Sequence, residues 1–158
     1  MTTKQIQYNN EYNKKNYDQI PIRVKKGFKQ VIQNYAERNN MSTNEYITTA
    51  IQKYNNQQQA EMIHNLKEKI TPIAKKYKVD KIILYGSRAR GDYHKNSDYD
   101  LFVNAGNING LIELLQFKEE IENVIKSKTD ITTANEDELD EYMLKEIKKD
   151  GIKVYERK

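Results

Sequence analysis

The sequence has no cysteine, no tryptophan, only two prolines and no long apolar run in its 158 residues. Without cysteine the chain can form neither a disulfide nor a thiolate metal site, and a cytoplasmic location fits. No apolar stretch approaches the roughly 18 residues that a membrane span needs, so we expect no membrane partner. The opening MTTKQIQYNNEYNKK lacks the apolar core of a secretory signal. Because it is polar throughout, we expect residues 1–16 to be a disordered tail.

Positive charge is concentrated in the first third of the chain. Residues 1–60 carry nine Lys or Arg and four Asp or Glu, a net of +5, whereas residues 61–158 carry eighteen and nineteen, a net of −1. A polyanion such as DNA is the natural partner of a basic segment, although an ordinary solvated surface has the same composition. The two parts of the chain therefore differ in the partners that they favour.

Residues 17–56 show the pattern of a strand followed by two helices. Ile20, Ile22 and Val24 alternate with Gln19, Pro21 and Arg23, which predicts a short half-buried strand. Because Pro21 has no N–H to donate, either this strand lies at a sheet edge or the nitrogen of Pro21 faces outward. A helical stripe follows Gly27, and a second helix begins after a capping box, Ser42 to Glu45. About 40 residues are too few to bury a core alone, but two copies could pair their strands and pack their helices.

This segment, IPIRVKKGFKQVIQNYAERNNMSTNEYITTAIQKY, resembles the ribbon-helix-helix DNA-binding family of the Arc and methionine-repressor type. The resemblance implies a homodimer whose paired strands enter the major groove of operator DNA. Pro21 departs from the pattern because it cannot hydrogen-bond to a base. The alternative is a module that only dimerises. The DNA-binding residues that the resemblance implies are Gln19, Arg23, Lys25, Ser42, Thr43 and Asn44.

Residues 57–60 form a predicted polar linker, and residues 61–158 alternate between helical and strand patterns. Pro72 either starts a new helix or kinks a continuous one. We expect strands at 81–85, 99–104, 129–133 and 152–155, and helices at 108–125 and 136–149. The alternation predicts an α/β (α+β) domain with a small mixed sheet flanked by helices.

Acidic residues recur at the edges of these predicted strands. Asp98 and Asp100 are two residues apart at the start of a strand, so their side chains point to the same face. Like charges side by side repel unless a cation neutralises them, and hard carboxylate oxygens suit Mg²⁺. Asp130 completes a triad if its strand pairs beside the strand of Asp100. The sequence therefore predicts a magnesium site formed by Asp98, Asp100 and Asp130.

A glycine–serine pair directly follows the first of these strands. Gly86 lets the backbone approach an anion closely, and the hydroxyl of Ser87 can donate to the same oxygens. Arg88 and Arg90 can supply positive charge nearby. We therefore predict that Gly86, Ser87, Arg88 and Arg90 bind the phosphates of a nucleotide.

The segment GSRARGDYHKNSDYDLFV, residues 86–103, together with Asp130, resembles the nucleotidyltransferase superfamily of DNA polymerase beta, and specifically its minimal nucleotidyltransferase (MNT) branch. The resemblance implies the nucleotidyltransferase fold, ATP as substrate and two Mg²⁺ ions held by the three acids. It also implies that Asp130 can act as the general base.

Minimal nucleotidyltransferases are typically paired with HEPN-domain RNases in toxin–antitoxin modules. The resemblance thus implies an antitoxin that transfers AMP from ATP to a tyrosine of a HEPN toxin and binds its own operator. One alternative is a DNA-binding repressor whose nucleotidyltransferase fold is a non-catalytic interaction module. Another is a nucleotidyltransferase that acts on a small molecule or an RNA end.

Overall fold

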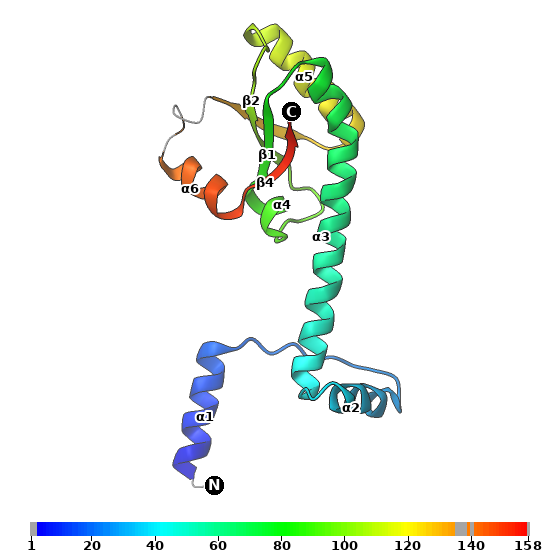
Figure 1. Ribbon diagram of the computed structural model, residues 1–158. Coiled ribbons are helices and arrows are strands. Elements are labelled where there is room, and N and C mark those ends of the chain that lie inside the picture. Colours follow the sequence, from blue (N-terminus) through cyan, green and yellow to red (C-terminus); the bar gives the residue numbers. More distant parts are fainter. Residues whose placement is uncertain (1–2, 135–138, 140, 158) are drawn as a thin grey trace. The chain divides into compact units, whose positions relative to one another are not determined.

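The computed structural model describes residues 3–134, 139 and 141–157, with the side chains of residues 3–7 and 9 left aside. The chain divides into two compact units, Met1–Thr49 and Ala50–Lys158 (Figure 1). Within the described residues, no helix combines the length and the apolar character needed to cross a membrane.

The first unit begins with a helix where the sequence predicts a disordered tail. Helix α1 spans Thr3–Asn16. Its Lys and Gln residues favour helix, although its four Asn residues do not, and the rings of Tyr8 and Tyr12 stack one turn apart with centroids at 6.5 Å. The prediction of disorder for residues 3–16 is therefore corrected. The sequence pattern did not indicate this helix because α1 has no apolar stripe at helical spacing.

Between α1 and α2 the chain forms no strand of its own. Residues 17–25 lie outside any regular element, and Ile20 and Ile22 are 82% and 55% exposed. A strand needs a hydrogen-bonded partner, and the ribbon predicted here would take that partner from a second chain. The ribbon therefore stays a prediction.

The two predicted helices of this module are present. Helix α2 spans Phe28–Arg38 and is preceded by Gly27, whose φ of +89° is in the left-handed region. The capping box also forms, since the Glu45 amide donates to the Ser42 hydroxyl at 3.1 Å and the Ser42 amide donates to the Glu45 carboxylate at 3.4 Å. These reciprocal bonds fix the start of α3.

Helix α3 is much longer than the sequence pattern predicts. It spans Thr43–Lys76, 34 residues, and runs through the predicted linker at 57–60 and through Pro72. The linker prediction is therefore wrong, and the continuous-helix alternative for Pro72 holds. Gln59, within the polar run, donates its side-chain amide to the carbonyl of Ala89. This contact lies thirty residues away in sequence, so no local pattern could indicate it.

The second unit contains a four-stranded mixed sheet in the order β3-β2-β1-β4. The strands are β1 (Lys81–Tyr85), β2 (Tyr99–Asn104), β3 (Thr129–Thr133) and β4 (Ile152–Glu156). Strand β1 is antiparallel to both β2 and β4, whereas β2 and β3 are parallel. The predicted α/β fold with a small mixed sheet is confirmed.

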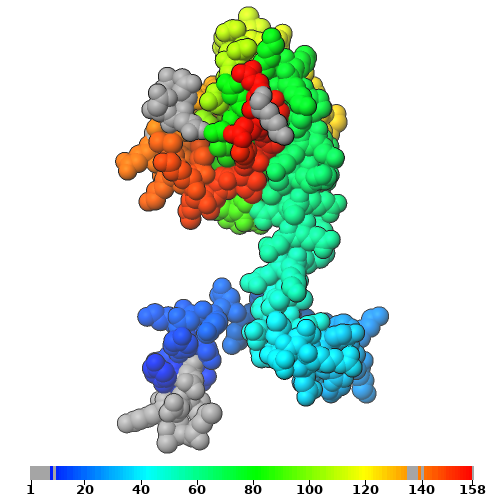
Figure 2. All heavy atoms as spheres, viewed as in Figure 1, coloured from blue at the N-terminus to red at the C-terminus, as the bar shows by residue number. Residues whose placement is uncertain are grey.

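Helices α4 (Gly86–Arg90), α5 (Gly110–Ile125) and α6 (Glu141–Asp150) complete this unit. Residues 136–138 and 140, where the last helix was predicted to begin, lie outside the described residues. In Figure 2 the visible surface of the unit includes α6 in orange beside β4 in red. The core packs the sheet against α3 and α5, and its fully buried side chains include Leu66, Ile70, Ile82, Leu84, Leu101, Val103, Phe117 and Ile121. Phe102 is also fully buried but projects, like Asp100, to the other face of the sheet.

Candidate active site

Two of the three predicted acids lie in one row across the sheet. Asp100 is the register partner of Asp130 in the parallel β2–β3 pair and of Tyr85 in the antiparallel β1–β2 pair. Register partners project their side chains to the same face, so the two carboxylates and the tyrosine share it. Asp98 precedes β2 by one residue and is two residues from Asp100. The predicted pairing of the strands of Asp100 and Asp130 is thus present.

The electrostatics of Asp100 reflect this crowding of acids. Partial burial raises the pKa of Asp100 above its ordinary value, and the charges of Asp130, Asp98 and Glu146 raise it further, while Arg90 acts in the opposite direction. Burial also raises the pKa of Tyr85, and Asp100, Asp130 and Glu146 add to that rise. The carboxylates of Asp98, Asp100, Asp130 and Glu146 therefore lie close together around the start of β2, where a cation would be stabilised.

Gly86 makes the closest approach to Asp100. A Cβ atom placed on Gly86 would lie 2.1 Å from Oδ2 of Asp100, and the backbone φ of +69° is in the left-handed region. Both observations require glycine here. The sequence predicts Gly86 as the residue that lets an anion approach the backbone, and the structure adds that the nearest anion is the carboxylate of Asp100. Ser87 follows in α4 and is half-buried.

Arg88 occupies a different environment from the one predicted. It is only 6% exposed. Its Nε donates to the carbonyls of Ser97 and Asp98 at 3.0 and 3.1 Å, its Nη2 donates to Ser97 at 2.5 Å, and the guanidinium lies over the rings of Tyr99 and Tyr93. These donors face protein carbonyls rather than solvent, so Arg88 holds the backbone of Asp98 and is corrected from a phosphate ligand to a positioning residue.

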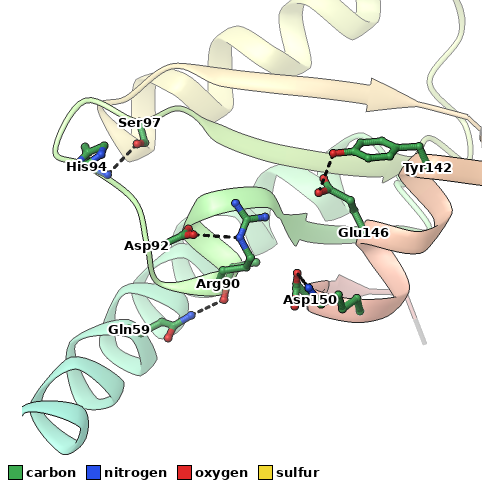
Figure 3. Close-up of polar contacts among 10 residues, drawn as sticks. Gln59, Arg90, Asp92, His94, Ser97, Tyr142, Glu146 and Asp150 are labelled. Atoms are coloured by element: carbon green, nitrogen blue, oxygen red, sulfur yellow. Dashed lines mark hydrogen bonds and ion pairs between the residues drawn. The ribbon is translucent and has the colours of Figure 1, made fainter. Parts of the chain in front are cut away.

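Arg90, at the end of α4, lies close enough to Asp100 for its charge to lower the pKa of that carboxyl, and its role in nucleotide binding stays a prediction. Its Nε lies 3.3 Å from Oδ2 of Asp92, and Figure 3 shows its guanidinium between Asp92 and helix α6. From α6, Glu146 acts on the pKa of both Asp100 and Arg90 and accepts a hydrogen bond from Tyr142 at 3.2 Å. Sequence reasoning missed Glu146, because its only signal is a position on an amphipathic helix whose placement depends on tertiary structure.

Magnesium fits this set of donors. The carboxylates supply hard oxygens and repel one another in the absence of a cation. Gly86, which has no Cβ, leaves space beside the carboxylate of Asp100. Among the described residues, no group of three or more His, Asp or Glu side chains forms a ready-made metal cage. Mg²⁺ usually takes one or two protein carboxylates and the phosphates of its substrate. Asp98, Asp100 and Asp130 would therefore hold the ion together with a bound nucleotide.

The predicted DNA-binding residues lie in the first unit. Gln19, Arg23 and Lys25 are exposed in the segment between α1 and α2. Ser42, Thr43 and Asn44 are at the start of α3, where Ser42 is already engaged in the cap. The structure contains neither DNA nor a second chain, so their role stays a prediction.

Comparison with known proteins bears on the second unit. Residues 68–158 match the family model described as "Polymerase beta, Nucleotidyltransferase". The "Putative protein adenylyltransferase MJ0435" of Methanocaldococcus jannaschii is 36% identical over 73 residues, which are 46% of this chain and 78% of that protein. A second protein of that archaeon with the same description, MJ1215, is 32% identical over 59 residues, 37% of this chain and 69% of its own length.

Solved structures resemble the chain more weakly. A toxin–antitoxin complex with AMP-PNP is 20% identical, with a TM-score of 0.49 over 58% of this chain and 74% of that one. A complex of a tri-AMPylated Shewanella oneidensis HEPN toxin with an MNT antitoxin is 15% identical, with a TM-score of 0.46 over 60% and 73%. Neither likeness is close enough to bear on function. The family model, in contrast, covers more than half of the chain. On that basis, and with the acids and the glycine–serine turn in place, this chain belongs to the polymerase beta nucleotidyltransferase family.

Proposed function

We propose that this protein is an Mg²⁺-dependent protein adenylyltransferase that transfers AMP from ATP to a tyrosine of a HEPN-domain RNase toxin and so acts as its antitoxin. One observation carries the catalytic part: Asp100 pairs with Asp130 across two strands, Asp98 is two residues away, and Gly86 touches the carboxylate of Asp100. Two M. jannaschii relatives that are named as protein adenylyltransferases support a protein acceptor. The resemblance of residues 86–103 to minimal nucleotidyltransferases supports the HEPN toxin as that acceptor.

The proposed reaction forms one bond and breaks another. The oxygen of the acceptor tyrosine attacks the α-phosphorus of ATP, the bond from that phosphorus to the bridging oxygen breaks, and pyrophosphate leaves. The hydroxyl proton passes to a carboxylate of the site, for which the exposed Asp130 is our candidate. Two Mg²⁺ ions, held by Asp98, Asp100 and Asp130, would supply neutralising charge to the phosphates and to the developing phenolate of the acceptor. Ser87 donates to a phosphate oxygen, and Arg90 places a positive charge beside it.

The test is a mass measurement on the acceptor. A HEPN-domain protein encoded beside this one is incubated with the full chain, ATP and Mg²⁺, and its intact mass should increase by one or more AMP groups on tyrosine. The double variant Asp98→Ala/Asp100→Ala should abolish the increase, while Glu119→Ala, an exposed acid on α5, should leave it unchanged. Persistent modification by the double variant would refute the proposed site.

For the first unit, we propose a homodimeric ribbon-helix-helix module that binds operator DNA. The apolar side chains of Ile20, Ile22, Val24, Phe28 and Val31 are all exposed in the single chain. Ile22, Val24 and Phe28 each have a basic neighbour in sequence, Arg23, Lys25 or Lys29. Exposed apolar side chains next to cations suit a module that pairs with a second copy and faces a polyanion.

DNA binding is tested with the promoter DNA upstream of the gene. Arg23→Ala should weaken binding about tenfold, whereas Lys128→Ala, an exposed cation of the second unit, should have no effect. Binding should fall steeply with added salt, because each phosphate contact releases counterions. Equal affinity of wild type and Arg23→Ala for this DNA would refute the proposal that the ribbon contacts DNA.

A further inference from the structure

The hydroxyl of Tyr142 lies beside the candidate active site. Tyr142 belongs to the first turn of α6 and is 72% exposed, and its hydroxyl donates to Oε1 of Glu146 at 3.2 Å. Helix α6 contacts both β1 and α4, the two elements that meet at Gly86. The charge of Glu146 in turn acts on the carboxyl of Asp100. One hydrogen bond therefore separates this phenol from a carboxylate that acts on the proposed metal site.

A cavity of about 320 Å³ between α4 and α6 gives the Tyr142 ring room to move. Tyr142, Glu146 and Arg90 are among the residues that line it. In Figure 3 the Tyr142 ring and the Glu146 carboxylate extend from α6 toward the side on which the Arg90 guanidinium lies. Arg90 also acts on the carboxyl of Asp100, so it connects the cavity to the acids. Because the ring is exposed, rotation about its side-chain bonds can carry the hydroxyl through this space.

Other tyrosines of the second unit lack either exposure or a position beside the acids. Tyr85 is the register partner of Asp100 but is only 8% exposed. Tyr99 precedes Asp100 in β2 and therefore projects to the opposite face of the sheet. Tyr54 is 63% exposed but lies on α3 ahead of Leu66, where the buried positions of that helix begin. Tyr142 combines an exposed phenol with a place next to the site.

We propose that Tyr142 is a self-modification site, at which the protein transfers AMP from ATP to its own phenol within one chain. The proposal rests on the proposed adenylyltransferase function and adds an internal acceptor to it. The phenol oxygen forms a bond to the α-phosphorus of ATP, the bond from that phosphorus to the bridging oxygen breaks, and pyrophosphate leaves. The phenol proton passes to Glu146, which already accepts it in a hydrogen bond.

The test is a mass measurement on the protein alone. Full-length wild type, incubated with ATP and Mg²⁺, should gain the mass of one AMP group, and peptide mapping should locate that group on Tyr142. Tyr142→Phe lacks the acceptor oxygen and should gain no mass. Tyr54→Phe is the matched control at another exposed tyrosine and should be modified like wild type. A wild-type chain whose AMP lies on a different tyrosine, with Tyr142 unmodified, would overturn the proposal.

The role of Glu146 is tested by the initial rate of self-modification. Glu146→Gln keeps the shape of the side chain but cannot take the phenol proton, so the rate should fall by at least about tenfold. Glu141→Gln changes an exposed acid of the same helix that has no such contact with Tyr142, and its rate should stay within about twofold of wild type. Equal rates for the two variants would overturn the assignment of Glu146 as the proton acceptor.

Transfer within one chain is tested by mixing wild type with Asp98→Ala/Asp100→Ala, which intact mass distinguishes. Tyr142 of the inactive variant should remain unmodified, and AMP at that position would overturn transfer within one chain.

A parallel reaction with the HEPN-domain protein separates this inference from the proposed function. AMP on that protein, with none on Tyr142, would overturn the self-modification alone. AMP on neither protein would overturn both proposals together.

Discussion

Among single residues, Asp100 has a charge that the fold disfavours. Burial raises its pKa, and the neighbouring Asp130 and Asp98 raise it further. For an acid whose pKa is higher in the folded than in the unfolded state, the folded state binds more protons between the two values. The free energy of unfolding therefore falls as pH rises through that window, and the charged Asp100 destabilises the metal-free protein at neutral pH. Such a cost is common where a site is arranged for a ligand.

Replacing this charge should stabilise the protein while disabling it. We expect Asp100→Asn to raise the Tm at pH 7 in EDTA by about 2 °C, a modest effect because the carboxyl is partly exposed. The gain should shrink at pH 4, because the raised pKa of Asp100 leaves fewer wild-type carboxyls charged there than at pH 7. Thermal scans at the two pH values test this, and a lower Tm for the variant at pH 7 would contradict the repulsion inferred here.

Gly86 offers a second test at this scale. In Gly86→Ala the new methyl group would meet the Asp100 carboxylate and the backbone would keep a positive φ, so we expect AMP transfer to fall by more than about 100-fold. Gly110→Ala is a matched control, since its φ is +81° but no atom lies within 4 Å of the added Cβ. Gly110→Ala should lower the free energy of unfolding, measured in urea, by only about 1 kcal/mol and should still transfer AMP. Equal losses in both variants would show that backbone strain alone matters.

At the scale of elements, Arg88 ties α4 to the start of β2. Its guanidinium donates to the carbonyls of Ser97 and Asp98 and stacks on Tyr99. A lysine could not form this fork, so Arg88→Lys should lower the free energy of unfolding by about 2–3 kcal/mol and raise the Mg²⁺ concentration needed for transfer.

The control for this change is Arg90→Lys, which alters an arginine of the same short helix at an exposed position. Its free energy of unfolding in urea should stay within about 0.5 kcal/mol of wild type. If Arg88→Lys were as stable as Arg90→Lys and needed no more Mg²⁺, the assignment of Arg88 as a positioning residue would be wrong.

The strands of the second unit could be predicted from sequence because their signals are local. Apolar runs bounded by polar or glycine residues place β1, β2 and β3 at the residues where the structure has them, and β4 within one residue. Asp100 and Asp130 lie side by side because their strands, β2 and β3, pair with each other. The sequence alone could predict this proximity only on the assumption that the two strands pair. Hydrophobic patterning and the pleat determine both features.

The remaining features depend on contacts that sequence patterns do not encode. The unbroken α3 passes through a polar run in which Gln59 meets Ala89 of a distant helix. The burial of Arg88 depends on two tyrosines that flank it only after folding. Glu146 reaches the site because α6 packs beside α4. In each case a long-range contact overrides or supplements the local signal.

At the scale of the whole molecule, the exposed apolar residues between α1 and α2 predict a dimer. Sedimentation equilibrium should give twice the monomer mass for the full chain. Ile22→Glu should convert the dimer to monomer, because Ile22 is exposed in the single chain and the proposed ribbon pairing would bury the new charge. Ile112→Glu is the matched control: Ile112 is also highly exposed but lies on α5. Dissociation by Ile112→Glu, with Ile22→Glu still dimeric, would place the interface in the second unit instead.

The most direct measurement of the central claim counts the metal ions at the acids. Mn²⁺ is a paramagnetic substitute for Mg²⁺ that also prefers carboxylate and phosphate oxygens, and its free concentration can be followed by electron paramagnetic resonance. With an uncleavable ATP analogue, we expect about two Mn²⁺ ions per wild-type chain, and almost none above the nucleotide alone for Asp98→Asn/Asp100→Asn. Identical Mn²⁺ binding by the wild type and this double variant would contradict the claim that these carboxylates form the metal site.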